Sequence, residues 1–367
     1  MAATDARTGR EDRILDIIAT ARAKRPKFRD ERITMAHGAG GKATAALIEG
    51  LLVPAFASPA LDELADAGAL AVDGAQLALT TDSFVVKPIR FPGGSIGELA
   101  VNGTVNDLAV AGARPLALTL SLILEEGLDT GVLRAEVDAI ASAARAAGVE
   151  IVAGDTKVVE RGHADQLYIC TTGVGRRDPR ARLSPAALRP GDRVLVSGPI
   201  GEHGTAIMLA RGEFDLGATV ESDTRPLWPA VDALLDAAGP GLRCLRDATR
   251  GGVASVLNEL ARASGVALLV HERAVPVNPV VTGAAELLGI DPMHVANEGV
   301  FVAVVAAEQA GAALAALRGA GDGETFARAA EIGEVKTEPP ALVLVETAFG
   351  GKRVMDQLVG DPLPRIC

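Results

Sequence analysis

Hydrophobic and polar positions along the chain switch repeatedly between strand and helix periodicity from about residue 32 onward. Residues 77–81 and the uninterrupted apolar run 116–124 have the composition of strands, and the first of these strands is expected to end at Asp82. Residues 130–147 are alanine-rich with apolar positions at helical spacing, and Gly148 would end that helix. The first half of the chain therefore mixes strands with helices.

The second half continues this mixture and opens with a predicted strand over 193–198. The other expected elements are helices at 47–56, 96–112, 206–211, 229–237, 281–288 and 310–317, a helix that runs through Ala263, and strands at 151–153, 166–173, 266–270, 300–305 and 342–345 and near Ala330. Because antiparallel and crossover segments alternate, we predict an α+β fold rather than a doubly wound one.

The length of 367 residues suits two domains, because a single hydrophobic core stops growing beyond about 250–300 residues. A loop containing Pro179, Pro185 and Pro190 separates the two halves. We predict an N-terminal extension over 1–31, which would be an appended helix or a disordered arm, a first domain over 32–185, a second domain over 186–346 and a tail over 347–367.

Composition excludes several classes of protein. The net charge of −11 and the aromatic content of 3% argue against nucleic-acid binding, since phosphate backbones attract a basic face and single strands need aromatic stacking. The longest apolar runs fall far short of the roughly 20 residues that cross a membrane. The start of the chain lacks the apolar core of a secretion signal, and three widely spaced cysteines indicate no disulfide framework. We therefore expect a cytoplasmic protein.

The chain ends on a thiol, that of Cys367, which can enter a pocket because no following segment has to pass it. Pro362 and Pro364 stiffen the approach, since each fixes its own φ. The tail is thus interpreted as an arm that carries a nucleophile. The alternative is a frayed end without a role.

Four aspartates are expected at the ends of strands or in turns: Asp82, Asp107, Asp155 and Asp247. Mg²⁺ takes oxygen ligands, usually one or two carboxylates together with substrate phosphates and water. Taken singly, each aspartate would be a cap or a turn residue. Taken together, with glycine beside three of them, they favour a site for a metal-bound nucleotide.

Two glycine-rich segments could approach phosphates closely through their backbone N–H groups. One contains His37, Gly38, Gly40 and Gly41, and the other contains Gly251. Neither is a Walker A loop, and each is as common in plain turns as in phosphate sites.

Two further charged residues have a structural and a functional interpretation. Lys157 lies two residues beyond Asp155, so it would either pair with that carboxylate or compensate the charge of a transferring phosphoryl group. Glu298 precedes a predicted strand and would be either a surface turn residue or a general base.

Several short motifs occur in an order typical of one protein family. They are His37-Gly38-Ala39-Gly40-Gly41, Thr81-Asp82-Ser83, Phe91-Pro92-Gly93-Gly94, Asn102-Gly103-Thr104-Val105-Asn106-Asp107, Glu125-Glu126-Gly127-Leu128, Gly154-Asp155-Thr156-Lys157-Val158-Val159, Asp247-Ala248-Thr249-Arg250-Gly251-Gly252 and the terminal Pro364-Arg365-Ile366-Cys367. With these motifs, residues 33–367 resemble the HypE family, the carbamoyl dehydratases of nickel–iron hydrogenase maturation. That family is grouped with aminoimidazole ribonucleotide synthetase and selenophosphate synthetase.

The resemblance implies a fold and a set of ligands. The fold would be that of aminoimidazole ribonucleotide synthetase: a homodimer whose first domains join their strands in a barrel, with an α+β second domain and a flexible tail. ATP and Mg²⁺ would be bound by His37, Gly38, Gly40, Gly41, Asp82, Asn102, Asp107, Asp155, Asp247 and Gly251, with Asp82, Asp107 and Asp247 on the metal. Lys157 would contact the reacting phosphates, and Glu298 would be a base close to the thiol of Cys367.

The resemblance also implies a reaction and its partners. A carbamoyl group on the sulfur of Cys367 would be dehydrated to a thiocyanate, with ATP phosphorylating the carbonyl oxygen before phosphate leaves. The product would supply the cyanide ligand of the hydrogenase iron. The carbamoyltransferase HypF would load the thiol, and a HypC–HypD complex would receive the cyano group.

Two other functions remain open at this stage. A relative of the same fold could phosphorylate a small soluble substrate, although selenophosphate synthetase typically has a reactive residue near its glycine loop, and positions 35–45 contain no cysteine. A non-catalytic scaffold could deliver a metal through Cys367, but a single thiol is a poor site without further soft ligands.

Overall fold

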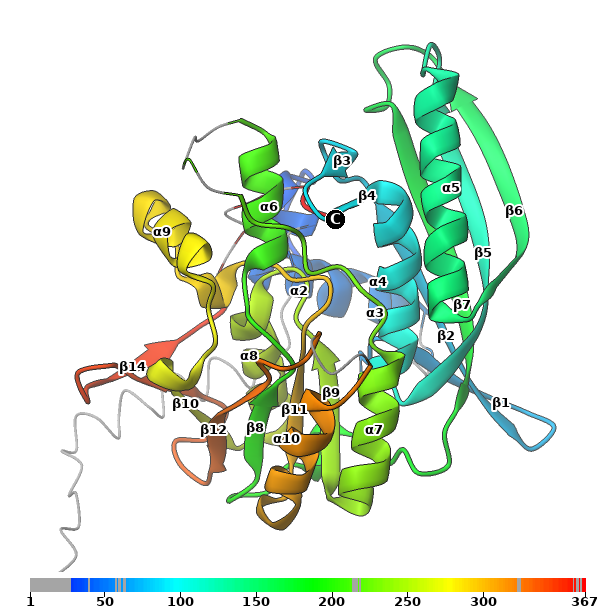
Figure 1. Cartoon of the computed structure of the whole chain (residues 1–367). Coiled ribbons are helices and arrows are strands. Elements are labelled where there is room, and N and C mark those ends of the chain that lie inside the picture. The colour runs from blue at the N-terminus through cyan, green and yellow to red at the C-terminus, as the bar shows by residue number, and fades with distance from the viewer. Residues whose placement is uncertain are drawn as a thin grey trace, which may run out of the picture.

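Two mixed sheets, each covered by helices, make up the chain and confirm the α+β class (Figure 1). The computed structural model describes residues 28–38, 40–56, 58, 61, 64–212, 217, 219–321, 325–358, 360, 363 and 365–367. Most of the predicted N-terminal extension therefore lies outside the described residues.

The first sheet has five strands, with β5 and β6 parallel and the other neighbours antiparallel. In spatial order they are β1 (Gly68–Val72), β2 (Ala75–Phe84), β7 (Leu167–Arg177), β5 (Ala113–Glu125) and β6 (Glu150–Val159). A short hairpin of β3 (Arg90–Phe91) and β4 (Gly94–Ser95) follows β2 along the chain.

Two helices, α4 (Ile96–Val110) and α5 (Thr130–Ala147), cover one face of this sheet (Figure 1). The limits of α5 agree with the prediction because local signals set both ends. The Asp129 carboxylate caps the first turn by accepting from the N–H groups of Gly131 and Val132, and Gly148 ends the helix at φ +69°. By contrast, α4 is buried nearly all around, as expected of a helix that lies between two layers.

The second sheet has seven strands, of which only β10 and β13 pair in parallel among the described residues. In spatial order they are β14 (Lys352–Met355), β13 (Val343–Glu346), β10 (Ala267–His271), β12 (Ala330–Lys336), β8 (Arg193–Val196), β11 (Phe301–Val305) and β9 (Leu242–Asp247).

Two hydrophobic clusters form on the second sheet. One joins α8 (Gly252–Ser264) to the sheet, and the other joins α7 (Trp228–Ala238) and α10 (Ala310–Arg318) to it. All five residues of β11 are buried, which fits a central strand covered on both faces. Helices α6 (Glu202–Ala210) and α9 (Pro279–Leu288) pack beside this domain.

The remaining helices are short. A helical segment runs from α2 (Lys42–Leu47) through a π-helical stretch (Ile48–Leu52) to α3 (Val53–Phe56). Single 3₁₀ turns occur at Met35–Gly38, Pro185–Ala187, Gly239–Gly241, Glu272–Ala274, Pro292–His294 and Ala307–Gln309. None of the helices in the described part of the chain combines the length and apolar character that a bilayer crossing requires.

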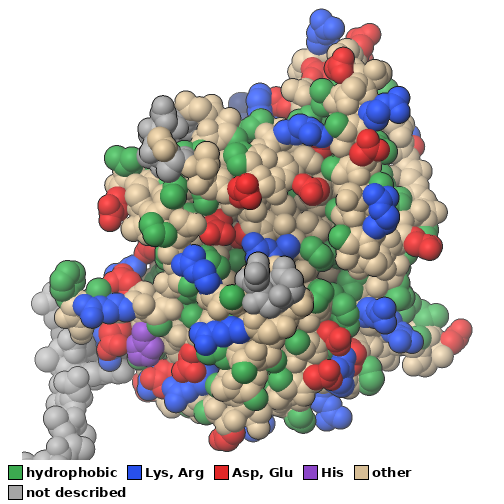
Figure 2. Space-filling model, viewed as in Figure 1, with side chains coloured by type: hydrophobic (Ala, Val, Ile, Leu, Met, Phe, Trp, Pro, Cys, Tyr) green, Lys and Arg blue, Asp and Glu red, His purple; other side chains and the backbone are tan. Residues whose placement is uncertain are grey.

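The first sheet carries exposed apolar side chains on the face opposite α4 and α5 and on its edge strand β6. Val152 and Val158 on edge strand β6 are 60% and 66% exposed, and Leu79 and Leu116 on β2 and β5 are 38% and 45% exposed. On the face of the molecule that Figure 2 shows, Lys and Arg side chains are interspersed with Asp and Glu rather than gathered in one basic area.

Three of the four predicted aspartate positions were wrong in local structure. Asp82 lies inside β2, which continues to Phe84, and Asp155 lies in the middle of β6. Asp107 is inside the helix α4. Only Asp247 ends its strand, β9, as expected. Runs of small and polar residues hid how far β2 and β6 extend, whereas the predicted helix over 96–112 already contained Asp107.

Candidate active site

Three of the predicted aspartates do come together, although from different kinds of element. Asp82 from β2, Asp107 from α4 and Asp247 from β9 are close enough to repel one another electrostatically. A fourth carboxylate, that of Asp66, lies just before β1 and belongs to the same group. We call these four residues the acidic cluster.

Burial raises the pKa of every carboxyl group in the acidic cluster. At Asp107, repulsion from Asp82 and then Asp247 adds to burial, and the pKa rises well above 3.8 even though Thr80 donates a hydrogen bond of 2.6 Å to the carboxylate. At Asp247, burial and then Asp66 have the same effect. The cluster therefore holds negative charge at a free-energy cost, which a bound cation would reduce.

Two arginines face this negative charge. Arg246 on β9 pairs with the carboxylate of Asp66, and its guanidinium also donates to the carbonyl of Leu64 at 3.0 Å. Arg250, three residues beyond β9, responds to charges on Cys367, Asp82, Glu298 and Asp107, which together raise its pKa. The Arg250 guanidinium is thus close enough to interact with both the end of the chain and the acidic cluster.

Glu298 is buried, with 4% of its surface exposed, which excludes the surface-turn interpretation. Burial, followed by repulsion from Asp223 and Asp247, raises its pKa well above 4.5. Its Oε1 atom meets no hydrogen-bond donor among the residues that the structure describes. Such a carboxyl group is suited to accept a proton at neutral pH.

Asp223 positions Glu298 through a hydrogen bond to its backbone. Its Oδ1 accepts from the backbone N–H of Glu298 at 2.8 Å, and burial raises its own pKa to about 6. The Asp223 carbonyl comes so close to Gly299 that a Cβ there would lie 1.8 Å from the oxygen. The sequence Asn297-Glu298-Gly299 therefore fits only because its last residue is glycine.

Two buried amides on α4 connect the helix to the second domain. Asn102, a predicted nucleotide contact, donates to the hydroxyl of Thr224 at 3.1 Å, and its Oδ1 meets no donor among the described residues. Asn106 donates to the carbonyls of Arg225 and Glu298 at 2.9 and 3.0 Å. These bonds hold Glu298 next to the helix that carries Asp107.

The two glycine-rich segments lie against each other. A Cβ on Gly40, whose φ is +76°, would be 2.8 Å from the Cβ of Arg250, and Gly251 next to it also has φ +76°. Gly41 precedes α2, and the Cβ position of Gly38 faces open space. The structure thus brings these glycines close to Arg250.

His37 has a structural environment in this segment. Its Nε2 lies 2.9 Å from a carboxylate oxygen of Asp30, its Nδ1 accepts from the backbone N–H of Thr34 at 3.0 Å, and its ring packs edge-on against Phe28. Both ring nitrogens are therefore occupied by the protein, and a contact to nucleotide remains a prediction.

Asp155 and Lys157 are not brought to the acidic cluster within this chain. Lys157 pairs with Asp155 at 2.6 Å on edge strand β6, where their side chains are 67% and 61% exposed. This pair matches the structural alternative raised from the sequence. The hydrogen bond from Lys157 lowers the pKa of Asp155.

The described residues at the end of the tail, from Leu363 onward, are packed into the molecule. Ile366 and Leu363 are 2% and 6% exposed and belong to the core of the first domain. The backbone N–H of Val85 donates to the carbonyl of Cys367 at 3.1 Å, and Nε2 of His203 on α6 lies 2.6 Å from the carbonyl oxygen of Ile366. The C-terminus therefore lies near α4, α6 and the β3–β4 hairpin (Figure 1).

The donor set of the acidic cluster fits a hard cation, since it offers only carboxylate oxygens and is stabilised by added positive charge. In the part of the chain that the structure describes, no three His, Cys, Asp or Glu side chains are already arranged as a metal site. Phosphate and water oxygens would therefore have to complete the shell of a bound Mg²⁺.

Sequence reasoning missed several residues of the site. Arg250 belongs to one of the family motifs, so its charge directly before two glycines was an available signal. Asp66, Asp223 and His203 stand in no motif, and only the tertiary structure brings them to the acidic cluster, to Glu298 and to the tail.

Comparisons with known proteins define the class of fold. Residues 64–177 match the family "AIR synthase related protein, N-terminal domain", and residues 189–344 match the corresponding C-terminal domain. The chain is thus a two-domain member of the aminoimidazole ribonucleotide synthetase-related proteins.

Closer similarities identify the family within that class. The chain is 49% identical over 342 residues to the carbamoyl dehydratase HypE of Rhodobacter capsulatus, covering 93% of this chain and 99% of the relative. A HypE structure in complex with HypF has a TM-score of 0.80 at 44% identity and covers 85% of this chain and 100% of its own. A HypE structure in complex with ATP has a TM-score of 0.76 at 44% identity, with 92% and 100% covered. The chain belongs to the HypE family of carbamoyl dehydratases.

Proposed function

We propose that this chain is an ATP-dependent carbamoyl dehydratase that acts on its own C-terminal cysteine and supplies cyanide to the iron of nickel–iron hydrogenase. The observation that carries the proposal is the position of Cys367. Its carbonyl accepts from the N–H of Val85, three residues beyond Asp82, and it lies close enough to Arg250 to interact with the same guanidinium as Asp82 and Glu298. The family membership and the similarity to an ATP complex support the same conclusion.

In the proposed reaction, a carbamoyl group is bound through its carbon to the Sγ atom of Cys367. Its carbonyl oxygen attacks the γ-phosphorus of ATP, and the bond to ADP breaks. The nitrogen loses one proton to Glu298. Loss of the second nitrogen proton and cleavage of the C–O bond then release phosphate and leave a thiocyanate, S–C≡N.

The residues of the site have separable roles in this reaction. The raised pKa of Glu298 suits proton transfer near neutral pH. Arg250 and the glycines beside it would stabilise negative charge on the phosphates. Asp82, Asp107 and Asp247 would hold Mg²⁺, which when bound neutralises charge on the transferring phosphoryl group.

The other predicted contacts also remain proposals. The set is His37, Gly38, Gly40, Gly41, Asn102, Asp155, Lys157 and Gly251. For Lys157 to reach phosphates, it must leave Asp155 or serve a site that a second copy completes.

We further propose three partnerships. Similarity to a HypE structure in complex with HypF supports HypF as the carbamoyl donor protein. A HypC–HypD complex as acceptor follows from family membership. A homodimer is supported by the exposed apolar side chains of Leu79, Leu116, Val152 and Val158 on the first sheet. The cytoplasmic location stays a prediction from the sequence.

The substitution Cys367→Ala tests the function. It should abolish both labelling by a carbamoyl donor and cyanide formation while ATP binding stays largely intact. The matched control is Cys170→Ser, which removes a half-exposed thiol on β7. Full activity of Cys367→Ala would refute the proposal.

A further inference from the structure

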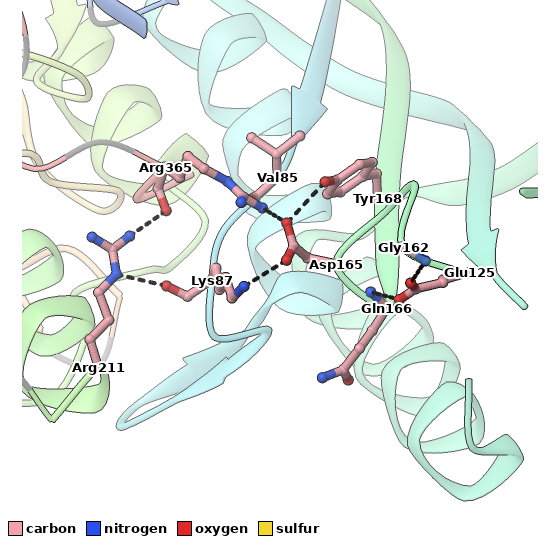
Figure 3. A network of polar contacts seen from close by, with 9 residues as sticks. All are labelled: Val85, Lys87, Glu125, Gly162, Asp165, Gln166, Tyr168, Arg211 and Arg365. Atoms are coloured by element: carbon pink, nitrogen blue, oxygen red, sulfur yellow. Dashed lines mark hydrogen bonds and ion pairs between the residues drawn. The ribbon is translucent and has the colours of Figure 1, made fainter. Parts of the chain in front are cut away.

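The arginine of the tail, Arg365, forms an ion pair with a carboxylate that does not belong to the acidic cluster. Its Nη2 lies 2.5 Å from Oδ2 of Asp165, in the turn between β6 and β7. Lys87, which follows β2, donates to the other oxygen at 2.7 Å, and the Tyr168 hydroxyl donates to Oδ2 at 3.1 Å (Figure 3). Asp165 thus joins the tail to two segments of the first domain.

Backbone carbonyls strengthen this connection. The guanidinium of Arg365 donates to the carbonyl of Val85 at 3.1 Å. The guanidinium of Arg211, at the end of α6, donates to the carbonyls of Arg365 and Lys87 at 2.8 and 2.9 Å (Figure 3). The tail is therefore fastened to both domains two residues before the thiol.

The backbone of Arg365 is strained in this position. Its φ is +59°, in the left-handed region that residues with a side chain rarely adopt. Such a conformation persists only where surrounding contacts determine it. The contacts of Arg365 thus hold the tail in a conformation that it would leave if they were broken.

The anchor is itself rigid. The carboxylate of Glu125, at the end of β5, accepts from the backbone N–H groups of Gly162 and Gln166 at 2.5 and 3.0 Å (Figure 3). These bonds fix both ends of the segment that carries Asp165. The carboxylate of Asp165 is therefore already in position before Arg365 binds. Docking of the tail does not have to order it.

Asp165 is ionised throughout the physiological range, because a hydrogen bond from Lys87 and then one from Arg365 lower its pKa to about 2. The side chains of Asp165 and Arg365 are 25% and 29% exposed. Salt and competing charges can therefore reach the pair, whereas a change of pH near neutrality does not switch it.

We propose that Asp165 is a positioning residue: its ion pair with Arg365 holds the tail docked with Cys367 at the active site, and breaking that pair releases the thiol for exchange with another protein. The consequence for catalysis rests on the proposed function. The docking itself does not.

The test measures how fast iodoacetamide alkylates Cys367 in the full-length protein, read from the mass of the C-terminal peptide. Asp165→Asn keeps the shape of the side chain and removes its charge. We expect alkylation to be roughly three- to tenfold faster in this variant. This is the effect expected when a charge-assisted hydrogen bond is lost at a half-exposed position. Added NaCl should accelerate alkylation of the unmodified protein and leave the variant unchanged.

Two further variants complete the design. Asp138→Asn removes an exposed charge on α5 in the same domain and should alkylate like the unmodified protein. Arg365→Gln leaves the turn before β7 untouched and should be alkylated at least as fast as Asp165→Asn, because it also removes the hydrogen bond to the Val85 carbonyl. The double variant should be no faster than Arg365→Gln, because the ion pair is already absent in that variant.

In single-turnover dehydration of carbamoylated protein, Asp165→Asn should lower the rate by a smaller factor than it raises alkylation, because a docked majority shrinks little when a small undocked fraction grows. Equal alkylation rates in Asp165→Asn, Arg365→Gln and the unmodified protein would overturn the proposal. If the unmodified protein performs no dehydration at all, the proposed function fails, while the alkylation rates still decide whether the tail is held by Asp165.

Discussion

Asn106 and Glu298 are joined across the two domains by a hydrogen bond of 3.0 Å, from the side-chain amide of Asn106 to the carbonyl of Glu298. The same amide donates to the carbonyl of Arg225, and its oxygen accepts from the N–H of Leu227 at 2.8 Å. One side chain on α4 thus satisfies three backbone groups of the second domain and positions the proposed base.

Replacing this amide should destabilise the protein. Asn106→Ala leaves buried backbone groups without partners, and each such group costs about 1–3 kcal/mol. We expect the free energy of unfolding, measured with urea, to fall by roughly 2–4 kcal/mol. Gln76→Ala, at an exposed position of β2, is the control and should change it by less than about 0.5 kcal/mol. An unchanged midpoint for Asn106→Ala would contradict the described contacts.

Glu298→Gln should lower the rate of catalysis without lowering the stability of the protein. Removing a general base should lower the dehydration rate by about 10²–10⁴. The control Glu126→Gln changes an exposed carboxylate and should leave the rate unchanged.

The same variant should be more stable than the unmodified protein at neutral pH. Since burial raises the pKa of Glu298 above 4.5, the folded state holds the proton more tightly than the unfolded chain, and stability is lost as pH rises from 4.5 toward the raised value. Thermal unfolding should show Glu298→Gln melting higher at pH 7, with the difference shrinking toward pH 4.5. A lower melting temperature at pH 7 would be inconsistent with an uncompensated carboxylate.

Asp107→Asn should reveal the repulsion within the acidic cluster. Without nucleotide or metal, the variant should melt at a higher temperature, because burial and the neighbouring Asp82 oppose ionisation of Asp107. The rise in melting temperature on adding Mg²⁺ with ATP should be smaller than for the unmodified protein. Asp138→Asn should show neither change. A full response of Asp107→Asn to Mg²⁺ and ATP would remove Asp107 from the proposed metal ligands.

A charge on the outer face of the first sheet should prevent self-association. Leu79→Glu introduces a carboxylate at a position of β2 where the leucine is 38% exposed and lies opposite the buried face of Ala78, and sedimentation should show a monomer. Val137→Glu changes an exposed valine on α5, which covers the opposite face, and should leave a dimer. A dimer for both variants would exclude this face as the interface.

The limits of several elements were predictable from local chemistry. Asp129 and Gly148 mark the two ends of α5, so the prediction of 130–147 was correct to the residue. The α+β class was also predictable. Strands β1, β9 and β14 were missed, because β1 is mostly exposed and the strands β9 and β14 each contain two positively charged residues, so none has a clear apolar pattern.

The site was only partly predictable. The motifs pointed to Asp82, Asp107 and Asp247, but nothing local to Asp66 or Asp165 indicates a role, since both act through arginines about 180 and 200 residues away. The tail was predicted as a flexible arm, whereas the described residues around Ile366 are packed against the core. Contacts between distant segments decide both points.

The most direct test of the central claim is the mass of the C-terminal peptide after the thiol has been carbamoylated and the protein incubated with ATP and Mg²⁺. The account predicts that the peptide containing Cys367 loses the mass of one water molecule, only when ATP is present. A carbamoylated Cys367 that keeps its full mass while ATP is consumed would contradict it.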